Sequence, residues 1–204
     1  NTLVSSNTPI QIGTATNWVT VIVGGYTTYA LKTDGTLWSW GANLNGEMGD
    51  GTTIEKHVPT QIGTSTNWQS IKAGHSHVIA IKTNGTLWAW GYNSYGQVGD
   101  GSVINKNIPT QIGTATNWQS ISAGFGHSSA IKTNGTLWTW GYNVFGQLGD
   151  NTTTNKNIPT QIGTATNWQN VSLGSYHTLT KKTDGTLWAN GYNSNGQLGD
   201  NTTT

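Results

Sequence analysis

Short apolar runs separated by polar turns recur along the whole chain with a spacing of 50 residues. Asn84-Gly85 separates two of these runs, and this dipeptide is typical of a hairpin with a type I′ turn, in which both central residues need positive φ. No stretch shows helical periodicity. Each unit is therefore predicted to be an antiparallel meander of four strands. In the second copy these are residues 68–73, 77–83, 86–92 and 109–112, and the fourth strand of the first copy is 59–62.

The unit occurs four times without insertion or deletion, at approximately residues 1–50, 51–100, 101–150 and 151–200. A repeat of this length is typical of architectures in which no unit buries its apolar faces alone. We therefore interpret residues 1–204 as a single repeat domain of the all-β class. A β-propeller with four-stranded blades is favoured over a β-solenoid, whose rungs are shorter and lack a hairpin in every unit.

The chain begins and ends at the same point of the repeat. Residues 9–12 match the fourth strand, whereas the last unit stops after its third strand. We expect the N-terminal strand to complete the last blade, because natural sheets avoid bare edges. Completion within one chain (in cis) gives a four-bladed ring, and completion between two chains (in trans) gives an eight-bladed dimer. We predict self-association, with a fragment of a longer ring as the alternative.

The fourth unit departs from the other three at two apolar positions. Lys181 stands where they have Leu or Ile, and Asn190 stands where they have Trp. Buried positions rarely accept Lys without a partner. We therefore predict that this blade faces solvent or a different neighbour, with sequence drift as the alternative.

Three short motifs recur in every copy. In the second copy, residues 74–80 read G-H-S-H-V-I-A, residues 84–93 read N-G-T-L-W-A-W-G-Y-N, and residues 96–99 read G-Q-V-G. These motifs resemble the repeat of the regulator of chromosome condensation family. The resemblance implies a propeller, usually of seven blades. The family includes a nuclear exchange factor for a small GTPase, but its wedge is an insertion that this gapless repeat lacks, so we do not expect nucleotide exchange.

Three histidines share one repeat position: His77, His127 and His177. Imidazole is a common zinc ligand, but ligands from separate blades would have to meet within about 2 Å of one metal. The resemblance implies a structural histidine that bonds backbone near the inner strands. We therefore expect no metal and no cofactor. A structural role is also expected for Trp38, Trp88, Trp138 and Trp188.

Charge and composition exclude several classes of function. The chain has 9 basic and 8 acidic residues, and every basic residue is Lys, so phosphate binding through a basic surface is not supported. No apolar run is long enough to span a membrane. We therefore expect neither nucleic acid partners nor membrane insertion. The low charge content favours an extracellular or cell-surface location in a bacterium, with the cytoplasm as the alternative.

The sequence does not suggest an enzyme. Acid–base catalysis needs paired titratable groups with separated pKa values, and no unique Asp–His pair is visible. The recurrent Asp50, Asp100, Asp150 and Asp200 follow glycine-rich turns without the spacing of a calcium loop, so we expect them to cap turns.

The differences between the units fall mainly in two loops that a meander places on one face of the ring. Aromatic residues among Asn, Ser and Thr suit carbohydrate or protein binding. We predict a non-enzymatic binding module, with a self-assembling scaffold as the alternative. Tolerated loop drift is an equally weighted explanation of these differences. The predicted contact residues are Tyr26, His75, Tyr95, Phe125, Phe145 and Tyr176.

Overall fold

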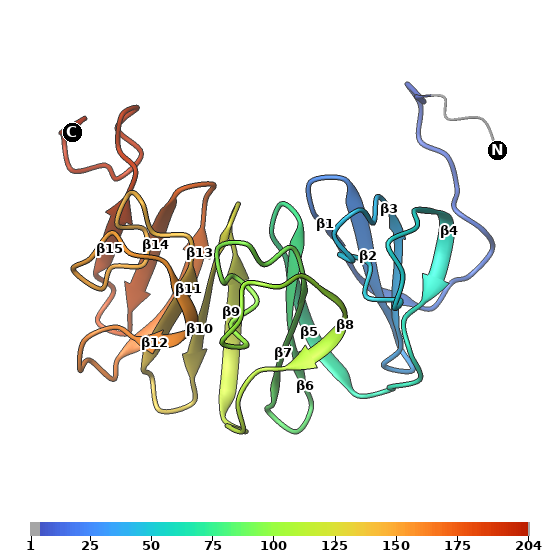
Figure 1. Ribbon diagram of the computed structural model, residues 1–204, viewed down its shortest axis with the longest axis horizontal. Coiled ribbons are helices and arrows are strands. Elements are labelled where there is room, and N and C mark those ends of the chain that lie inside the picture. Colours follow the sequence, from blue (N-terminus) through green and yellow to red (C-terminus); the bar gives the residue numbers. More distant parts are fainter. Residues whose placement is uncertain (1–4, 204) are drawn as a thin grey trace.

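The structure, a computed structural model, describes residues 5–203 and consists of four antiparallel β-sheets that stand side by side (Figure 1). Each sheet is one blade. Blade 1 contains β1 (Trp18–Val23), β2 (Thr27–Lys32), β3 (Leu37–Gly41) and β4 (Lys56–Gln61). Blade 2 contains β5 (Trp68–Ala73), β6 (His77–Lys82), β7 (Leu87–Gly91) and β8 (Lys106–Gln111). Blade 3 contains β9 (Trp118–Ala123), β10 (His127–Lys132), β11 (Leu137–Gly141) and β12 (Lys156–Gln161). Blade 4 contains β13 (Trp168–Leu173), β14 (His177–Lys182) and β15 (Leu187–Gly191).

The hairpin between the second and third strands of each blade is confirmed, but its predicted turn type is wrong. In blade 2 the Gly85 N–H donates to the Lys82 carbonyl at 2.8 Å, and the Lys82 N–H donates to the Thr86 carbonyl at 3.1 Å. Gly85 has a φ of 75°, whereas Asn84 is not among the residues with positive φ. The loop is therefore a three-residue turn that ends in a left-handed glycine, which needs one positive φ rather than two.

The first three strands of each blade match the predicted runs to within one residue, but the fourth lies earlier than predicted. β4 spans Lys56–Gln61 instead of residues 59–62. Its register pairs Ser39 with Thr60 and Gly41 with Lys56, and the irregularity between these pairs accommodates the offset. Pro59 lies inside this strand because β4 is an edge strand, where a missing N–H breaks no ladder.

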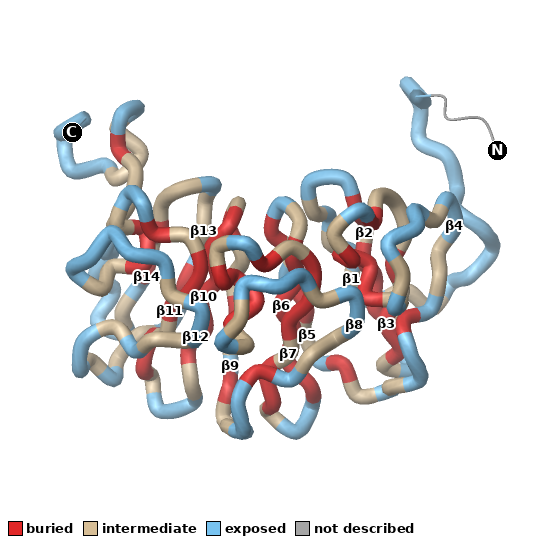
Figure 2. The backbone as a smooth tube through the Cα atoms, in the orientation of Figure 1, coloured by how far each residue is buried: buried red, intermediate tan, exposed pale blue. Residues whose placement is uncertain are grey.

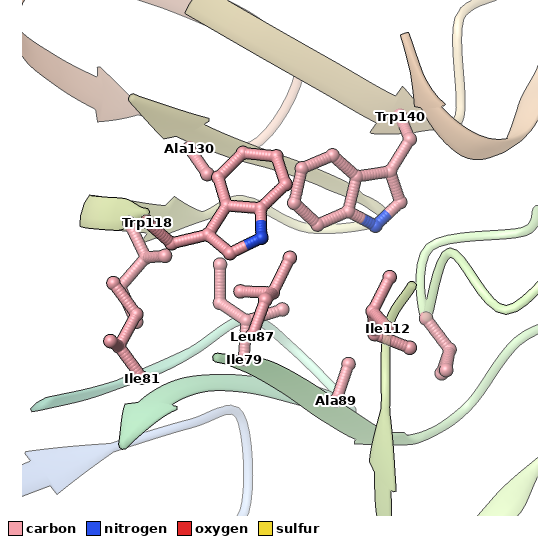
Figure 3. Packing of buried hydrophobic residues seen from close by; sticks show 10 residues of the cluster. Ile79, Ile81, Leu87, Ala89, Ile112, Trp118, Ala130 and Trp140 are labelled. Atoms are coloured by element: carbon pink, nitrogen blue, oxygen red, sulfur yellow. The ribbon is translucent and has the colours of Figure 1, made fainter. Parts of the chain in front are cut away.

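The hydrophobic core lies between the blades. At the junction of blades 2 and 3, Trp118 and Trp140 pack over Ile79, Ile81 and Leu87 (Figure 3). A matching cluster joins blades 1 and 2, and a smaller one joins blades 3 and 4. Complete burial of a large indole stabilises the fold by up to about 6 kcal/mol. Each junction therefore depends on residues from both of its blades.

A lysine braces two indole rings within every blade. Lys32 Nζ lies 4.7 Å from the ring centroid of Trp18 and 3.9 Å from that of Trp38. Trp38 also donates from Nε1 to the Thr36 hydroxyl at 2.9 Å. Cation–π contacts of this kind hold the first and third strands against the second. Trp88, Trp138 and Trp188 make the same contacts in the other blades.

The last blade is not completed in cis in this structure. Its sheet has three strands, and residues 9–12 belong to no strand. Figure 1 shows the N-terminal segment beside blade 1 and the C-terminal segment beside β15, at opposite ends of the row. Figure 2 shows buried positions along the strands and exposed positions at both ends. Lys181 is exposed, and so is Leu187 on the same uncovered blade, so the prediction made for this lysine stays a prediction.

The other unusual residue of blade 4 lies on its inner side, toward blade 3. Asn190 Nδ2 donates to the Gly146 carbonyl at 3.0 Å. At the same repeat position Trp90 and Trp140 donate from Nε1 to carbonyls of the preceding blade at 2.8 and 2.9 Å. The substitution therefore keeps a donor across the junction while removing a large apolar ring.

Candidate functional site

Nine rings gather on the face formed by the loops between the first and second strands and between the third and fourth strands. They form a continuous series of ring contacts across all four blades, and we call this set the aromatic surface. It consists of Tyr26, His75, Tyr92, Tyr95, Phe125, Tyr142, Phe145, Tyr176 and Tyr192.

The aromatic residue types are divided between the core and this face. The chain has seven Tyr and two Phe, and Tyr29 is the one member of these two types outside the aromatic surface. Tyr29 is buried in the junction of blades 1 and 2. The Trp residues instead lie within the blades and their junctions, as Trp90 and Trp140 do. Core packing therefore does not account for the rings on the loop face.

Four rings from the first loops form an inner row, one from each blade. The centroids of Tyr26 and His75 are 5.8 Å apart, those of His75 and Phe125 are 4.7 Å apart, and those of Phe125 and Tyr176 are 5.3 Å apart. These separations are in the range of favourable aromatic pairs. Consecutive backbones are also linked, since the Gly25 N–H donates to the His75 carbonyl at 2.9 Å.

The second loops and the ends of the third strands form an outer row. Tyr95 and Tyr142 have centroids 4.7 Å apart, and Phe145 and Tyr192 have centroids 4.8 Å apart. Phe145 lies 5.6 Å from Tyr176, so the two rows meet over blades 3 and 4. Burial, with a smaller effect of neighbouring Tyr92, raises the pKa of the Tyr95 phenol. This phenol therefore stays neutral and able to donate a hydrogen bond.

An open depression of about 390 Å³ lies beside the inner row. His75 and Phe125 line it, together with backbone of Gly74, Gly124 and Gly174. Tyr26, at the blade 1 end of the inner row, is 77% exposed, and Phe145, in the outer row, is 40% exposed. The aromatic surface thus offers both projecting rings and a concave region lined by rings and glycines.

The structure brings all six predicted contact residues into this one surface. Sequence reasoning missed Tyr92, Tyr142 and Tyr192, because they belong to the repeated Gly-Tyr-Asn motif and were treated as part of the framework. Blade 1 has Ala42 at this position, and that difference was the available signal. Contacts between rings of different blades depend on how the blades are arranged, which the sequence does not show directly.

The predicted structural histidines lie at the blade junctions, and their partners differ from the expectation. His77 Nε2 lies 2.9 Å from the Ser128 hydroxyl of the next blade, not from backbone. Because Ser128 donates its own proton to the Gln97 carbonyl at 2.8 Å, its oxygen accepts from the His77 N–H. His127 and Thr178 repeat this arrangement at 3.2 Å. The third, His177, is only half-buried.

This arrangement bears on the zinc alternative. The Ser128 geometry requires hydrogen on His77 Nε2, which donates across the junction, and leaves the lone pair on Nδ1, which is buried without a hydrogen-bond partner among the described residues. Within residues 5–203, no group of three or more His, Cys, Asp or Glu side chains could hold a metal ion. The geometry therefore assigns the two buried histidines to blade-to-blade contacts.

The turn-capping role of the recurrent aspartates is confirmed. Asp50 Oδ1 accepts from the Thr52 N–H at 2.9 Å and from the Thr52 hydroxyl at 2.8 Å. Lys56 Nζ lies 3.7 Å from the other carboxylate oxygen. Burial acts to raise the pKa of Asp50, but these hydrogen bonds and the ammonium outweigh it and lower the pKa. Asp100 and Asp150 have matching contacts.

Comparison with sequence models of protein families shows which family the chain belongs to. The sequence model described as the regulator of chromosome condensation (RCC1) repeat matches residues 34–81, 84–131 and 134–180. A second model of the same description matches residues 19–47, 68–97, 118–147 and 168–197. The chain belongs to the RCC1 repeat family. These matches confirm the resemblance read from the motifs.

Solved structures of other proteins have the same fold. Prp20p from Saccharomyces cerevisiae, in work that addressed its binding to Gsp1p and histones, superposes with a TM-score of 0.83 at 22% identity over 96% of this chain and 50% of its own. Human WBSCR16 gives a TM-score of 0.81 at 23% identity over 95% of this chain and 52% of its own. Yeast RCC1 (Prp20) bound to Kap60 gives a TM-score of 0.79 at 21% identity over 91% of this chain and 46% of its own. The chain spans about half the length of these relatives, and at this identity the similarity establishes the fold alone.

No curated protein sequence matches this chain significantly. The residues that the structure describes include no helix with the length and apolar character of a membrane span.

Proposed function

We propose that the chain is a non-enzymatic binding module that binds a neutral carbohydrate through the aromatic surface. The observation that carries this proposal is the concentration of both Phe and six of the seven Tyr on one loop face. Flat rings cover the apolar faces of sugars, and phenols supply hydrogen bonds at the ring edges. An extracellular or cell-surface location in a bacterium is part of the proposal, because such a site would meet glycans there.

The chemistry around the rings favours an uncharged ligand over an ionic one. Eight of the nine rings belong to Tyr or Phe, and His75 is the exception. The carboxylates of Asp50, Asp100 and Asp150, which follow the second loops, are each paired with a lysine, and among the described residues Asp200 alone of the four is exposed without a lysine partner. An acidic or basic ligand would therefore find little opposite charge to offset its desolvation.

The test is a glycan array followed by calorimetric titration of the glycans that bind. Tyr176→Ala should weaken binding about tenfold, because Tyr176 lies where the inner and outer rows meet. Loss of its ring as a stacking surface should remove about 1.4 kcal/mol of binding free energy. Ile108→Ala is the matched control, since Ile108 is an exposed apolar residue outside the aromatic surface. An array without signal would contradict the proposal, as would equal affinities of Tyr176→Ala and the parent chain.

A structural, self-assembling role is the second candidate, and it is favoured by the open faces at the two ends of the row. On blade 4, Leu187 is 71% exposed although its counterparts Leu37 and Leu87 are fully buried. On blade 1, Val21 is 63% exposed although its counterpart Ile71 is 2% exposed. Assembly through these faces should survive Ala substitution of the aromatic surface, and its loss in such variants would argue against this role.

A further inference from the structure

The open faces of blades 1 and 4 carry the two halves of the junction that already joins neighbouring blades. We infer that blade 4 of one copy packs on blade 1 of a second copy through a seam that repeats the internal junctions. This inference rests on the structural role proposed above and is independent of any ligand.

The strongest observation is a matched pair of side chains at each junction. His77 donates to Ser128, and His127 donates to Thr178, always from one blade to the next. Where blade 1 has Thr27 in place of the histidine, blade 2 has Val78 in place of the hydroxyl. The histidine and the hydroxyl are therefore present together or absent together.

The same rule connects the two ends of the chain. Blade 4 has His177, and the position that would receive it in a following blade corresponds to Thr28 of blade 1. Thr28 carries a hydroxyl at this position and is half-buried in the single chain. By the internal pattern this hydroxyl accepts from His177 of the first copy and donates to the Gln197 carbonyl, as Ser128 donates to Gln97.

A second internal contact also has both of its halves at the ends. Trp90 inserts beside Gly49 and donates to the Glu47 carbonyl. Trp140 inserts beside Gly99 and donates to the Gln97 carbonyl. Gly199 of blade 4 has nothing within 4 Å of the position that a β-carbon would take, and it lies in a cavity of about 500 Å³ lined by Leu187, Trp188 and Leu198. Trp40 of blade 1, which is only half-buried, is the matching ring for this cavity.

A third contact supplies the sharpest test. The hairpin glycines Gly35 and Gly85 lie against the Thr66 and Thr116 carbonyls of the next blade so closely that a β-carbon would collide with them. Gly185 of blade 4 has the same conformation, with a φ of 88°, and nothing lies within 4 Å of its β-carbon position. In the seam it would meet the carbonyl of Thr16 of the second copy.

The N-terminal segment would then complete blade 4 in trans. The pairing of Trp138 with Gln161 in blade 3 corresponds to Trp188 with Gln11 of the second copy. Ile10 and Ile12 are 72% and 51% exposed in the single chain, which is consistent with a strand that lacks its sheet. Contacts of this kind are heterologous, so they form a closed ring or an open head-to-tail array, and rings of eight blades are within the known range.

Lys181 is the residue of the seam that departs from the internal junctions. Its counterparts Ile81 and Ile131 are 1% exposed, so the seam would draw its ammonium toward an apolar interface. A buried charge without a partner is unfavourable. The seam is therefore expected to be weaker than the junctions inside the chain, and replacing this lysine should strengthen it.

The experiment is sedimentation equilibrium of the 204-residue chain and its variants. Gly185→Ala should abolish association while the variant stays folded, because its only effect on the single chain is the strain of one turn. Thr28→Val should weaken association about tenfold, because it leaves a buried imidazole N–H without an acceptor. The double variant Thr28→Val, His177→Thr copies the Thr27–Val78 pair and should recover most of that loss.

Lys181→Ile should tighten association, and Gly63→Ala is the control for a positive-φ glycine remote from any neighbour. Circular dichroism and melting temperature establish that each variant folds. A chain that remains monomeric at every concentration overturns both the structural role and the seam. Association that is unchanged by Gly185→Ala and Thr28→Val overturns the seam alone.

Discussion

At the scale of single residues, the buried histidines connect the blades and make stability depend on pH. Burial lowers the pKa of His77 to about 3, with a smaller contribution from His127, and burial also lowers the pKa of His127 to about 3. The ordinary value is 6.5, so the unfolded chain binds protons on these side chains at a higher pH than the folded chain does. Acid therefore favours unfolding.

The free energy of unfolding should fall as the pH is lowered from about 6.5 toward about 3, by up to about 1.4 kcal/mol per pH unit for each buried histidine. Below about 3 both states bind the proton and the contribution is constant. Urea denaturation between about pH 7 and about pH 5.5 measures this slope above the range in which the aspartates titrate. The variant His77→Thr, Ser128→Val, which copies Thr27 and Val78, should show a smaller slope. Equal slopes would contradict the assignment.

At the scale of elements, the hairpin turn does two things at once. Gly85 supplies the positive φ that ends the turn, and its missing side chain allows the Thr116 carbonyl of the next blade to approach. The Trp118 N–H donates to the Gly85 carbonyl at 3.1 Å, so the same residue also binds the next blade. A substitution here affects the turn and the junction together.

Gly85→Ala should lower the free energy of unfolding by about 2–5 kcal/mol, from backbone strain and from overpacking of the junction. Gly63→Ala has the same kind of backbone strain, with a φ of 59° and nothing nearby, and should lose about 1–2 kcal/mol. Urea denaturation of both variants at one pH gives the comparison. Losses of equal size would show that the junction does not constrain this position.

The elements also show how far the sequence predicts the structure. The first three strands and the hairpin follow from local patterns: apolar runs, and an Asn-Gly or Asp-Gly turn between two of them. The fourth strand, such as Lys106–Gln111, was misplaced because it is polar, contains Pro109 and lies at an edge, so no alternation marks its start. The turn type was wrong because a three-residue loop and a two-residue loop share the same dipeptide.

At the scale of the whole molecule, contacts between blades were the part that sequence patterns did not supply. The hydroxyl partner of His77 lies in the next blade, 51 residues away in the chain. Of the three tyrosines of the Gly-Tyr-Asn motif, Tyr142 and Tyr192 contact rings of a neighbouring blade, whereas Tyr92 contacts Tyr95 of its own blade. Repetition predicted that blades exist and that they pack, whereas the pairing of side chains across a junction needed coordinates.

The arrangement of the blades also sets the size of the proposed binding site. The aromatic surface runs from Tyr26 on blade 1 to Tyr192 on blade 4, and ends where the row of blades ends. If the end faces form the seam, Tyr176 of one copy lies beside blade 1 of the other, and the surface continues around the ring. Ligand binding should then become tighter or multivalent in the associated form.

Native mass spectrometry of the 204-residue chain tests the central claim, that its open ends complete one another, most directly. One chain has a mass of 21.8 kDa, so a closed ring of two copies has twice that value, 2 × 21.8 = 43.6 kDa. We predict the 43.6 kDa species, or larger head-to-tail multiples, and its loss in Gly185→Ala. A species of 21.8 kDa alone at every concentration would contradict the claim.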